Sequence, residues 1–459
     1  MAQSKSNKKL RQARERAQTY HQEYPFRTTL DLNRISIDKT WTFSDLTQKQ
    51  TRYISHGYYT YPAKFIPQLA RRLICELTAE SDTVVDPFMG SGTTIVEAMI
   101  SGRKGVGTDV NPVAHLVAKV KSTPINPELL RKVYGQLVVD LEHYLAQRPN
   151  LFARYHPPII PENERIDYWF RPSEKERLGI IFGRITVIEE PDCRDFFLVA
   201  FSQSLKSSSI WMQKSIKPTR DRAKVPVDPL AAFLRQSRFM LKQNEKFWNL
   251  VPPSVRSNLD EYRVVTQSDA RVLPVSTGDA SLVVTSPPYV TSYEYADLHQ
   301  LTALWLGYTN SVNQFRHSFI GSAYSNRSTI DLRSDIANAI VENLETEKKR
   351  REVRNYFADM LECFREMYRV LRVGGKACIV IGNTKFEGVE IANAQVFIEQ
   401  MMSLGFVVHK IIKREIPSKI LPQTRDPENG QFTSSANAEK VLAYPVEFIL
   451  IMEKQHGIR

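Results

Sequence analysis

The sequence predicts an α/β protein whose mostly parallel sheet is interrupted by a large, mainly helical insertion. Strand-like apolar runs at 83–86 and 105–109 flank a helical run at 94–101. A strand, a helix and a second strand within so short a stretch form a βαβ unit, which requires parallel strands. Strand-like runs resume only after residue 260, and residues 125–260 have helical character with proline-rich joints.

The expected elements follow one another in an ordered way. A helix at 66–77 is indicated by apolar residues at helical spacing, and Gly102 stops the helix at 94–101. After the insertion, the sequence predicts strands at 263–267, 282–285, 377–381 and 447–453, and helices at about 353–371 and 394–404. Gly374 and Gly375 are expected to form the turn out of the first of these two helices.

The composition is that of a globular protein without a membrane span. Of the 459 residues, 42% are hydrophobic and 24% are charged, and no apolar run reaches the length of a transmembrane helix. The polar, basic N-terminus is unlike a secretory signal. The four cysteines are scattered and indicate neither a disulfide framework nor a metal site. A reducing, cytoplasmic setting is therefore expected.

The net charge of +12 favours a polyanionic partner. Within the first 20 residues, six basic side chains stand against the single acid Glu15. This stretch is interpreted either as an arm that contacts nucleic acid or as a solubilising tail. A second basic segment, residues 201–242, is the best candidate surface for phosphate groups, with a solvated helical face as the alternative. Its proposed contacts are Lys214, Lys217, Arg220, Arg222 and Lys224.

Two segments in the first half of the expected sheet are typical of a nucleotide site. Residues 86–94 read Asp-Pro-Phe-Met-Gly-Ser-Gly-Thr-Thr, a glycine turn between a strand and a helix whose free N–H groups can meet a ligand. Ile95 stands where the dinucleotide fingerprint has its third glycine. Asp109 ends the next strand, where it can accept hydrogen bonds from ribose hydroxyls, although an Asp or Asn there can also cap a helix.

Two further segments follow the insertion. Asp269 comes after the strand at 263–267 and can accept from an adenine amino group, with ordinary turn chemistry as the alternative. A buried strand then runs into Ser286, Pro287, Pro288 and Tyr289. The two prolines hold an extended backbone that presents acceptor oxygens, and the tyrosine offers a flat face for a base. Alone, this segment would equally suit an extended strand exit with a core tyrosine.

Together these segments resemble the amino-methyltransferases of DNA, the N4-cytosine and N6-adenine family. The resemblance rests on residues 86–94 and 285–289, supported by residues 61–67, 268–271 and 371–376. It implies a Rossmann-like S-adenosylmethionine methyltransferase sheet of seven strands with the last one antiparallel. It also implies a cofactor site for S-adenosyl-L-methionine, without a metal. The implied cofactor residues are Phe65, Asp86, Phe88, Gly90, Gly92, Thr93, Asp109 and Asp269.

The resemblance further implies a reaction at an exocyclic amino group of a flipped base in duplex DNA. Ser286 and the Pro287 carbonyl would accept the two N–H groups of that amine, and Tyr289 would stack on the base. Serine at 286 is typical of N4-cytosine enzymes, and N6-adenine is the alternative. The protein would be the modification part of a restriction-modification system, with a cognate endonuclease as a possible partner. Two different functions also stay open, an RNA amino-methyltransferase and a non-enzymatic DNA-binding module.

This interpretation divides the chain into four parts. Residues 1–55 form the basic arm and an extension, and residues 56–124 form the cofactor half of the catalytic domain. Residues 125–260 are the candidate target-recognition region, and residues 261–459 form the active-site half.

Overall fold

The computed structural model describes residues 31–62, 64–145, 157–215, 218–290, 295–316, 319–320, 330–386, 388–416, 424–425, 441–442 and 446–455. The chain divides into two compact units, residues 1–36 and 37–459. In the first unit, the described residues form one 3₁₀ turn, η2 (Leu32–Arg34), capped by Asp31, whose side chain accepts from Asn33 N. The basic arm predicted within the first 20 residues lies outside the described residues.

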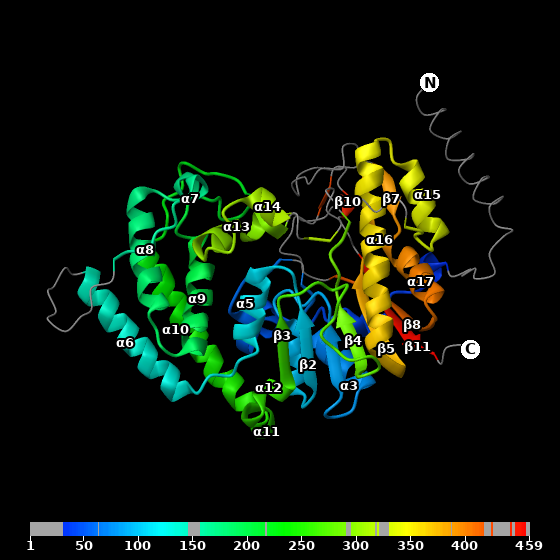
Figure 1. Cartoon of the computed structure of the whole chain (residues 1–459), viewed down its shortest axis with the longest axis horizontal. Helices are drawn as coiled ribbons and strands as arrows, with labels where there is room; N and C mark the ends of the chain where they lie inside the picture. The colour runs from blue at the N-terminus through cyan, green and yellow to red at the C-terminus, as the bar shows by residue number, and fades with distance from the viewer. Residues whose placement is uncertain are drawn as a thin grey trace. The chain divides into compact units, whose positions relative to one another are not determined.

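Seven strands of the second unit form one sheet in the order β3–β2–β1–β4–β5–β11–β8 (Figure 1). Neighbouring strands from β3 to β5 pair in parallel, whereas β11 is antiparallel to both β5 and β8. The mostly parallel sheet with an antiparallel last strand is therefore confirmed. The strands are β1 (Thr83–Asp86), β2 (Lys104–Thr108), β3 (Arg263–Thr266), β4 (Ala280–Thr285), β5 (Leu371–Ile381), β8 (Phe406–Glu415) and β11 (Val446–Lys454).

The direction of the strand order changes at β1. From β1 the chain passes to β2 and, after the helical insertion, to β3 on one side, and it then returns to β4 on the other side. Such a switch point leaves a crevice at the carboxyl ends of the two central strands, because the loops there run in opposite directions. The site residues predicted at the ends of β1, β2 and β4 are thereby brought to one edge of the sheet.

Two predictions about the second half of the sheet need correction. Gly374 and Gly375 do not form a separate turn, because β5 begins at Leu371 and includes them. Gly374 has φ +76°, and the pairing of β5 with β4 shifts register here, so the glycines make a bulge within the strand. The edge strand β8 was not predicted. Its burial is irregular and it carries five charged or histidine side chains, which hides the apolar pattern of a strand.

Helices cover both faces of the sheet. α3 (Pro67–Leu77) and α4 (Thr93–Ile100) pack on one face, where Leu69 and Leu73 join Val84, Leu282 and Ile449 in a buried cluster. α16 (Glu347–Val370) runs in front of β5 in Figure 1, and α17 (Asn393–Ser403) packs beside it on β8 and β11. α5 (Pro112–Lys121) follows β2 and contacts β3.

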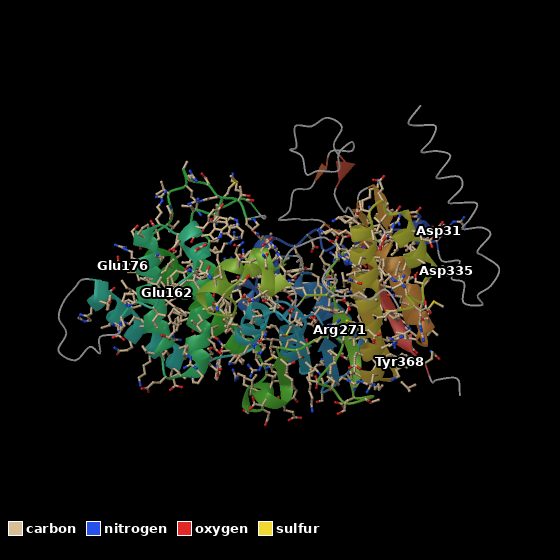
Figure 2. The ribbon with its side chains drawn as sticks, turned by 45° about the horizontal axis from the view of Figure 1, so that its top comes forward. Asp31, Glu162, Glu176, Arg271, Asp335 and Tyr368 are labelled. Carbon is tan, nitrogen blue, oxygen red and sulfur yellow. The ribbon has the colours of Figure 1, made fainter. Side chains whose placement is uncertain are left out.

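The described residues of 127–262 form a group of helices that packs on α4, α5 and the edge of the sheet, which confirms the mainly helical insertion. Proline occupies the first turn of five of them, a position where its missing N–H costs nothing. The helices are α6 (Pro127–Leu145), α7 (Glu164–Trp169), α8 (Pro172–Thr186), α9 (Pro191–Leu205), α10 (Pro229–Leu250), α11 (Pro253–Ser257) and α12 (Leu259–Tyr262). Figure 2 marks Glu162 and Glu176 in this group, away from Arg271 and Tyr368 near α16.

A helix that follows β4 in the sequence also packs against the helical insertion. α13 (Tyr295–Trp305) contacts α5, α7 and α9, so the chain after the predicted active segment returns to the helical insertion. The remaining described elements are η3 (Lys39–Trp41), α2 (Gln48–Thr51), η4 (Ile54–Gly57), α14 (Val312–Arg316), α15 (Asp335–Asn343), β6 (Thr384–Phe386), β7 (Val389–Ile391), β9 (Thr424–Arg425) and β10 (Val441–Leu442). None of the described helices is long and apolar enough to cross a membrane.

Candidate active site

A pocket lies at the carboxyl ends of β1, β2 and β4, where the strand order changes direction. The space within its lining residues, including the part open to solvent, is about 790 Å³. The lining residues are Tyr61, Lys64, Phe65, Asp86, Pro87, Phe88, Met89, Gly90, Ser91, Thr93, Asp109, Val110, Ala270, Ser286, Pro288, Tyr295, Phe319 and Ile320.

Asp86 joins three elements beneath this pocket. Its carboxylate accepts from Thr94 Oγ1 of α4 at 2.7 Å and from Thr285 Oγ1 of β4 at 2.6 Å. Phe88 N donates to the same group at 3.1 Å. Asp86 is 2% exposed, and this burial raises the pKa of the carboxyl to about 6. Although Asp86 lines the pocket, both of its carboxylate oxygens accept hydrogen bonds from other residues of the protein. Its role is therefore to hold the strand ends and the glycine turn together.

The glycine turn needs its glycines for steric reasons. Gly90 and Gly92 have φ of +47° and +76°, in the left-handed region that side chains disfavour. A Cβ on Gly92 would lie 3.0 Å from both Cα and Cβ of Ala118 in α5, so Gly92 permits close packing of the turn on that helix. A Cβ on Gly90 would lie 3.2 Å from the Tyr61 ring. Gly90 lines the pocket, whereas Gly92 supports it from behind.

Asp109 also lies in the pocket wall. Its two oxygens accept from Gly90 N at 3.0 Å and from Asn111 N at 2.9 Å. Burial raises the pKa of this carboxyl to about 6. The cap of α5 is Asn111, whose side chain accepts from Val113 N at 2.9 Å, so Asp109 is not needed for capping. The remaining lone pairs of Asp109 are available to hydroxyl groups of a ligand, as the ribose interpretation requires.

Two buried hydroxyls in the pocket wall lack partners. Ser91 Oγ and Thr93 Oγ1 make no hydrogen bond within the described part of the chain. A buried hydroxyl without a partner is unfavourable by about 1–3 kcal/mol, so a ligand with polar groups would satisfy both. Phe65 and Phe88 contribute aromatic surface to the same pocket. Acceptors at Asp109, donors at the glycine turn and these rings together fit a ligand with hydroxyl, polar and flat apolar parts.

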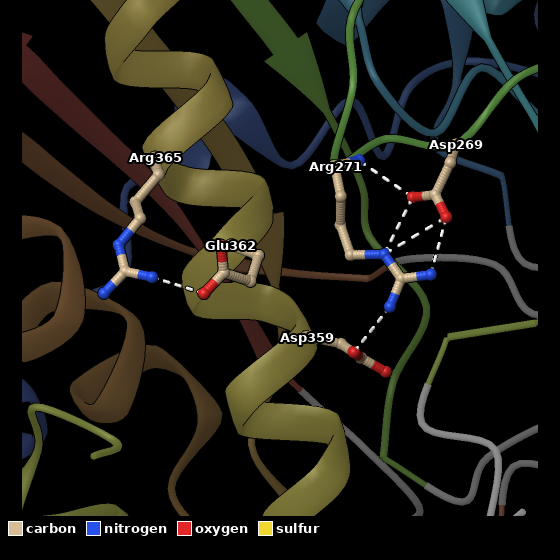
Figure 3. A network of polar contacts seen from close by, with 5 residues as sticks. All are labelled: Asp269, Arg271, Asp359, Glu362 and Arg365. Carbon is tan, nitrogen blue, oxygen red and sulfur yellow. Dashed lines mark hydrogen bonds and ion pairs between the residues drawn. The ribbon is translucent and has the colours of Figure 1, made fainter. Parts of the chain in front are cut away.

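Asp269 stands beside the pocket within an ion-pair network (Figure 3). Arg271 Nη2 lies 2.6 Å from Asp269 Oδ2, and Arg271 Nη1 lies 2.7 Å from Asp359 Oδ1 of α16. Arg271 N also donates to Asp269 Oδ1 at 2.8 Å. The adjacent Ala270 lines the pocket, whereas Asp269 does not. Its predicted contact with adenine remains a prediction, and turn chemistry accounts for part of its bonding.

The segment after β4 is held from two sides. Tyr356 Oη of α16 donates to the Pro288 carbonyl at 2.7 Å, and Tyr289 Oη accepts from Gly382 N at 3.1 Å. Ser286 and Pro288 line the pocket, but the buried Pro287 and the half-buried Tyr289 do not. Tyr289 is therefore fixed at the end of β5, and its predicted stacking on a base remains untested.

Several pocket residues were not singled out from the sequence. Tyr61 and Lys64 belong to the segment 61–67, which was recognised only for Phe65. Tyr295 and Phe319 come from beyond β4, and Tyr61 packs against His299 of α13 at 4.7 Å between ring centroids. Burial lowers the pKa of His299 to about 4. No local sequence pattern predicted that these aromatic residues line the pocket, because they reach it only through the packing of the chain that follows β4.

The basic side chains proposed to contact phosphate groups differ in their exposure and in their partners. Lys214 and Arg222 are exposed, and the Arg220 guanidinium lies 4.4 Å from the Tyr168 ring centroid. Lys224 differs from the expectation of a phosphate contact. Its Nζ donates to the carbonyls of Lys206 at 2.8 Å and Trp211 at 2.7 Å, and burial lowers its pKa to about 8. Lys224 therefore braces a turn. Lys217 lies outside the described residues.

Among the described residues, no group of three or more His, Cys, Asp or Glu side chains could hold a metal ion. The polar groups of the pocket are thus hydroxyls, carboxylates, one lysine and backbone amides.

Comparison with known protein families matches residues 2–120 and 280–457 to a family described as DNA methylase, N6_N4_Mtase. Type II methyltransferase M.MvaI of Kocuria varians is 27% identical over 430 residues, which cover 85% of this chain and 91% of that protein. Type II methyltransferase M.BsoBI of Geobacillus stearothermophilus is 21% identical over 392 residues, which cover 72% of this chain and 75% of that protein.

Two crystal structures are also similar. A putative DNA modification methylase from Thermus thermophilus, complexed with S-adenosyl-L-methionine, aligns at TM-score 0.20 and 18% identity over 42% of this chain and 55% of that one. A TehB-like SAM-dependent methyltransferase from Corynebacterium glutamicum aligns at TM-score 0.27 and 9% identity over 84% of this chain and 87% of that one.

Proposed function

The chain belongs to the DNA methylase family whose model it matches, and on that premise we propose that it methylates the N4 amino group of cytosine in duplex DNA. Membership makes it an S-adenosylmethionine-dependent methyltransferase of the N4/N6 kind. The choice of base, the site residues and the partners are the proposal. The observation that carries it is that Ser286, at the end of the buried strand β4, lines the same pocket as Asp109 and the glycine turn.

The cofactor supplies an electrophilic methyl group on a sulfonium. The pocket suits it because Asp109 can accept from ribose hydroxyls, and the unpaired Ser91 and Thr93 hydroxyls can meet the polar amino-acid end. Phe65 and Phe88 provide apolar surface between these ends. Asp86 acts by holding the glycine turn against β4, and Gly92 by letting the turn pack on α5.

Ser286 orients the amine that is methylated. The lone pair of an aromatic amino nitrogen is delocalised into the ring, so the amine is a weak nucleophile. Hydrogen bonds from its two N–H groups to Ser286 Oγ and the Pro287 carbonyl favour a pyramidal nitrogen with a directed lone pair. This role is orientation and electrostatics, which can contribute roughly 7–11 kcal/mol when the reacting groups are well aligned. Tyr356, bonded to the neighbouring Pro288 carbonyl, keeps the acceptor row in place.

A base within a duplex cannot reach a pocket at the ends of the strands, so the proposal includes base flipping. Residues 125–260 are the proposed target-recognition region, because the family model leaves residues 121–279 unmatched and the described part of this region is mainly helical. Lys214, Arg220 and Arg222 remain the proposed phosphate contacts, while Lys224 is removed from that set. A cognate restriction endonuclease would be the functional partner.

The experiment that tests the base assignment is methylation of duplex DNA with labelled cofactor, followed by nucleoside analysis. The expected product is N4-methylcytosine. N6-methyladenine would overturn the choice of base but keep the enzyme class. Label confined to RNA would overturn the DNA substrate, and DNA binding without any transfer would favour the non-enzymatic module.

A further inference from the structure

The first two turns of α16 concentrate positive charge. Residues 347–354 carry five basic and two acidic side chains. Each acid lies beside one of the cations: Glu352 Oε2 is 3.1 Å from Lys349 Nζ, and Glu347 Oε2 is 3.9 Å from Arg350 Nη1. The two acids therefore leave the other three basic side chains of the segment uncompensated.

Two of these three side chains are exposed and make no polar contact. Arg354 is half-buried, and its Nη2 donates to the Ile330 carbonyl at 2.8 Å. Lys348 and Arg351 are exposed, and neither has a hydrogen bond or ion pair with any other described residue. Because they are three positions apart, they are neighbours on the surface of the helix. They form a pair of positive charges that faces solvent.

Helix stability does not explain this pair. The N-terminus of a helix carries a partial positive charge, which favours acidic side chains and disfavours basic ones. The first turn of α16 contains one acid, Glu347, whereas Lys348 and Arg351 lie within the first five positions. Like charges three positions apart also repel. Both cations therefore oppose folding of this end of the helix, and a negatively charged partner would offset that effect.

This end of α16 lies at the edge of the sheet where the pocket opens. Near the other end of the helix, Arg369 O accepts from Gly278 N, just before β4, at 3.0 Å. Tyr356 Oη instead bonds to the Pro288 carbonyl, just after β4. α16 therefore runs antiparallel to β4. Lys348 and Arg351 precede Tyr356 by eight and five residues, which places them roughly 12 and 8 Å farther along the helix axis, beyond the segment after β4.

The pair and the helical insertion lie on opposite sides of the pocket. In the insertion, α9 packs on α5, which contacts the edge strand β3, whereas α16 packs on β5 (Figure 1). The pocket is at β1 and β4, which lie between β3 and β5 in the strand order. Duplex DNA carries one phosphate charge per about 1.7 Å of its axis. A duplex whose base enters the pocket can thus present phosphates to both sides.

We propose that Lys348 and Arg351 form a second phosphate-contact surface, which binds the backbone of duplex DNA on the β5 side of the pocket. The inference rests on the proposed function, because it needs duplex DNA as the substrate. Arginine can bind a phosphate through two parallel N–H groups, and lysine binds it as a point charge. Such contacts carry no sequence information, but they fix the orientation of the duplex over the pocket.

The test measures how the affinity of the full chain for duplex DNA depends on salt concentration. The probes are two duplexes of unrelated sequence. The variant Lys348→Gln with Arg351→Gln is compared with the wild type and with the control Arg365→Gln with Arg372→Gln. The control removes the same charge from the distant half of α16 and from the start of β5.

We expect the slope of the logarithm of the binding constant against the logarithm of salt concentration to fall by about two in the Lys348 and Arg351 variant. Affinity in about 0.1 M salt should fall roughly 10- to 100-fold, and equally for both duplexes. The control should keep the wild-type slope, and Arg351→Lys alone should keep it too. A slope unchanged in the Lys348 and Arg351 variant, or an equal loss in the control, would overturn the proposal.

Thermal unfolding separates phosphate binding from a structural role. Because both cations oppose the helix, the Lys348 and Arg351 variant should unfold at the wild-type temperature or slightly above it, and it should bind S-adenosylhomocysteine, the demethylated cofactor, as the wild type does. A lower unfolding temperature with an unchanged salt slope would contradict the assignment. If the wild type neither binds nor methylates duplex DNA, the proposed function fails and this inference with it. If the wild type methylates DNA but the variant keeps the full slope, only this inference fails.

Discussion

The Asp86 carboxylate offers a sharp test of how the pocket is held together. Replacing Asp86 with Asn keeps the size of the side chain but removes a buried charge. The amide oxygen can still accept from Phe88 N and Thr285 Oγ1. The new NH₂ group can donate to Thr94 Oγ1, because the Thr94 hydroxyl can direct its own proton to the Val284 carbonyl at 3.1 Å. The hydrogen-bonded joint between β1, β4 and α4 should therefore survive.

The charge, by contrast, has a measurable effect on stability. The pKa of Asp86 rises from 3.8 to about 6 on folding, so protonation favours the native state. Its contribution is fully present below pH 3.8 and is lost as pH rises through 6. A shift of two pKa units corresponds to about 3 kcal/mol. At pH 4 the carboxyl of the unfolded chain is already partly ionised, so the difference in unfolding free energy between pH 4 and pH 8 should change by about 2 kcal/mol in Asp86→Asn relative to wild type.

The assay is urea unfolding at a series of pH values for wild type, Asp86→Asn, Asp86→Ala and the exposed control Asp45→Asn. Above pH 6, Asp86→Asn should keep the stability that the wild type loses as its carboxyl ionises. Asp86→Ala should lose about 2–6 kcal/mol at every pH, because it leaves the Thr285 hydroxyl and Phe88 N–H buried without an acceptor. The reasoning is refuted if Asp86→Asn shows the same pH profile as wild type while Asp45→Asn behaves normally.

Three further predictions concern the catalytic segment, the glycine turn and the basic segment. Ser286→Ala should keep S-adenosylhomocysteine affinity but lower kcat by roughly 10²–10³-fold, the usual effect of losing one positioned hydrogen-bonding group; unchanged turnover would remove Ser286 from the reaction. Gly92→Ala should lower stability by about 1–3 kcal/mol and weaken cofactor binding, because the new Cβ meets Ala118 at 3.0 Å; a thermal unfolding curve like that of wild type would contradict this. Lys214→Ala with Arg222→Ala should reduce the salt dependence of DNA binding by a slope of about two, whereas Lys224→Met should lower thermal stability instead; the reverse pattern would return Lys224 to the DNA surface.

Much of the sheet could be predicted because its signals are local. β1 was predicted with its observed limits, and β2, β3, β4 and β11 within a few residues, since each contains a short run of apolar residues. The edge strand β8 escaped because an exposed strand does not need an apolar pattern. Gly374 was placed in a turn because a left-handed glycine looks the same in sequence whether it ends a helix or makes a bulge.

The candidate site likewise has features that could be predicted from local sequence and features that could not. The sequence by itself determined where the glycine turn, Asp109 and Ser286 fall, because each follows directly from the end of a strand, and parallel strands bring such ends to one edge. Only the tertiary structure decided which groups are free to act. The ammonium group of Lys224 donates to two backbone carbonyls, and the Tyr289 hydroxyl accepts from Gly382 N, whereas Lys64 lines the pocket. Bonding capacity depends on partners that are distant in sequence, and packing alone brings those partners together.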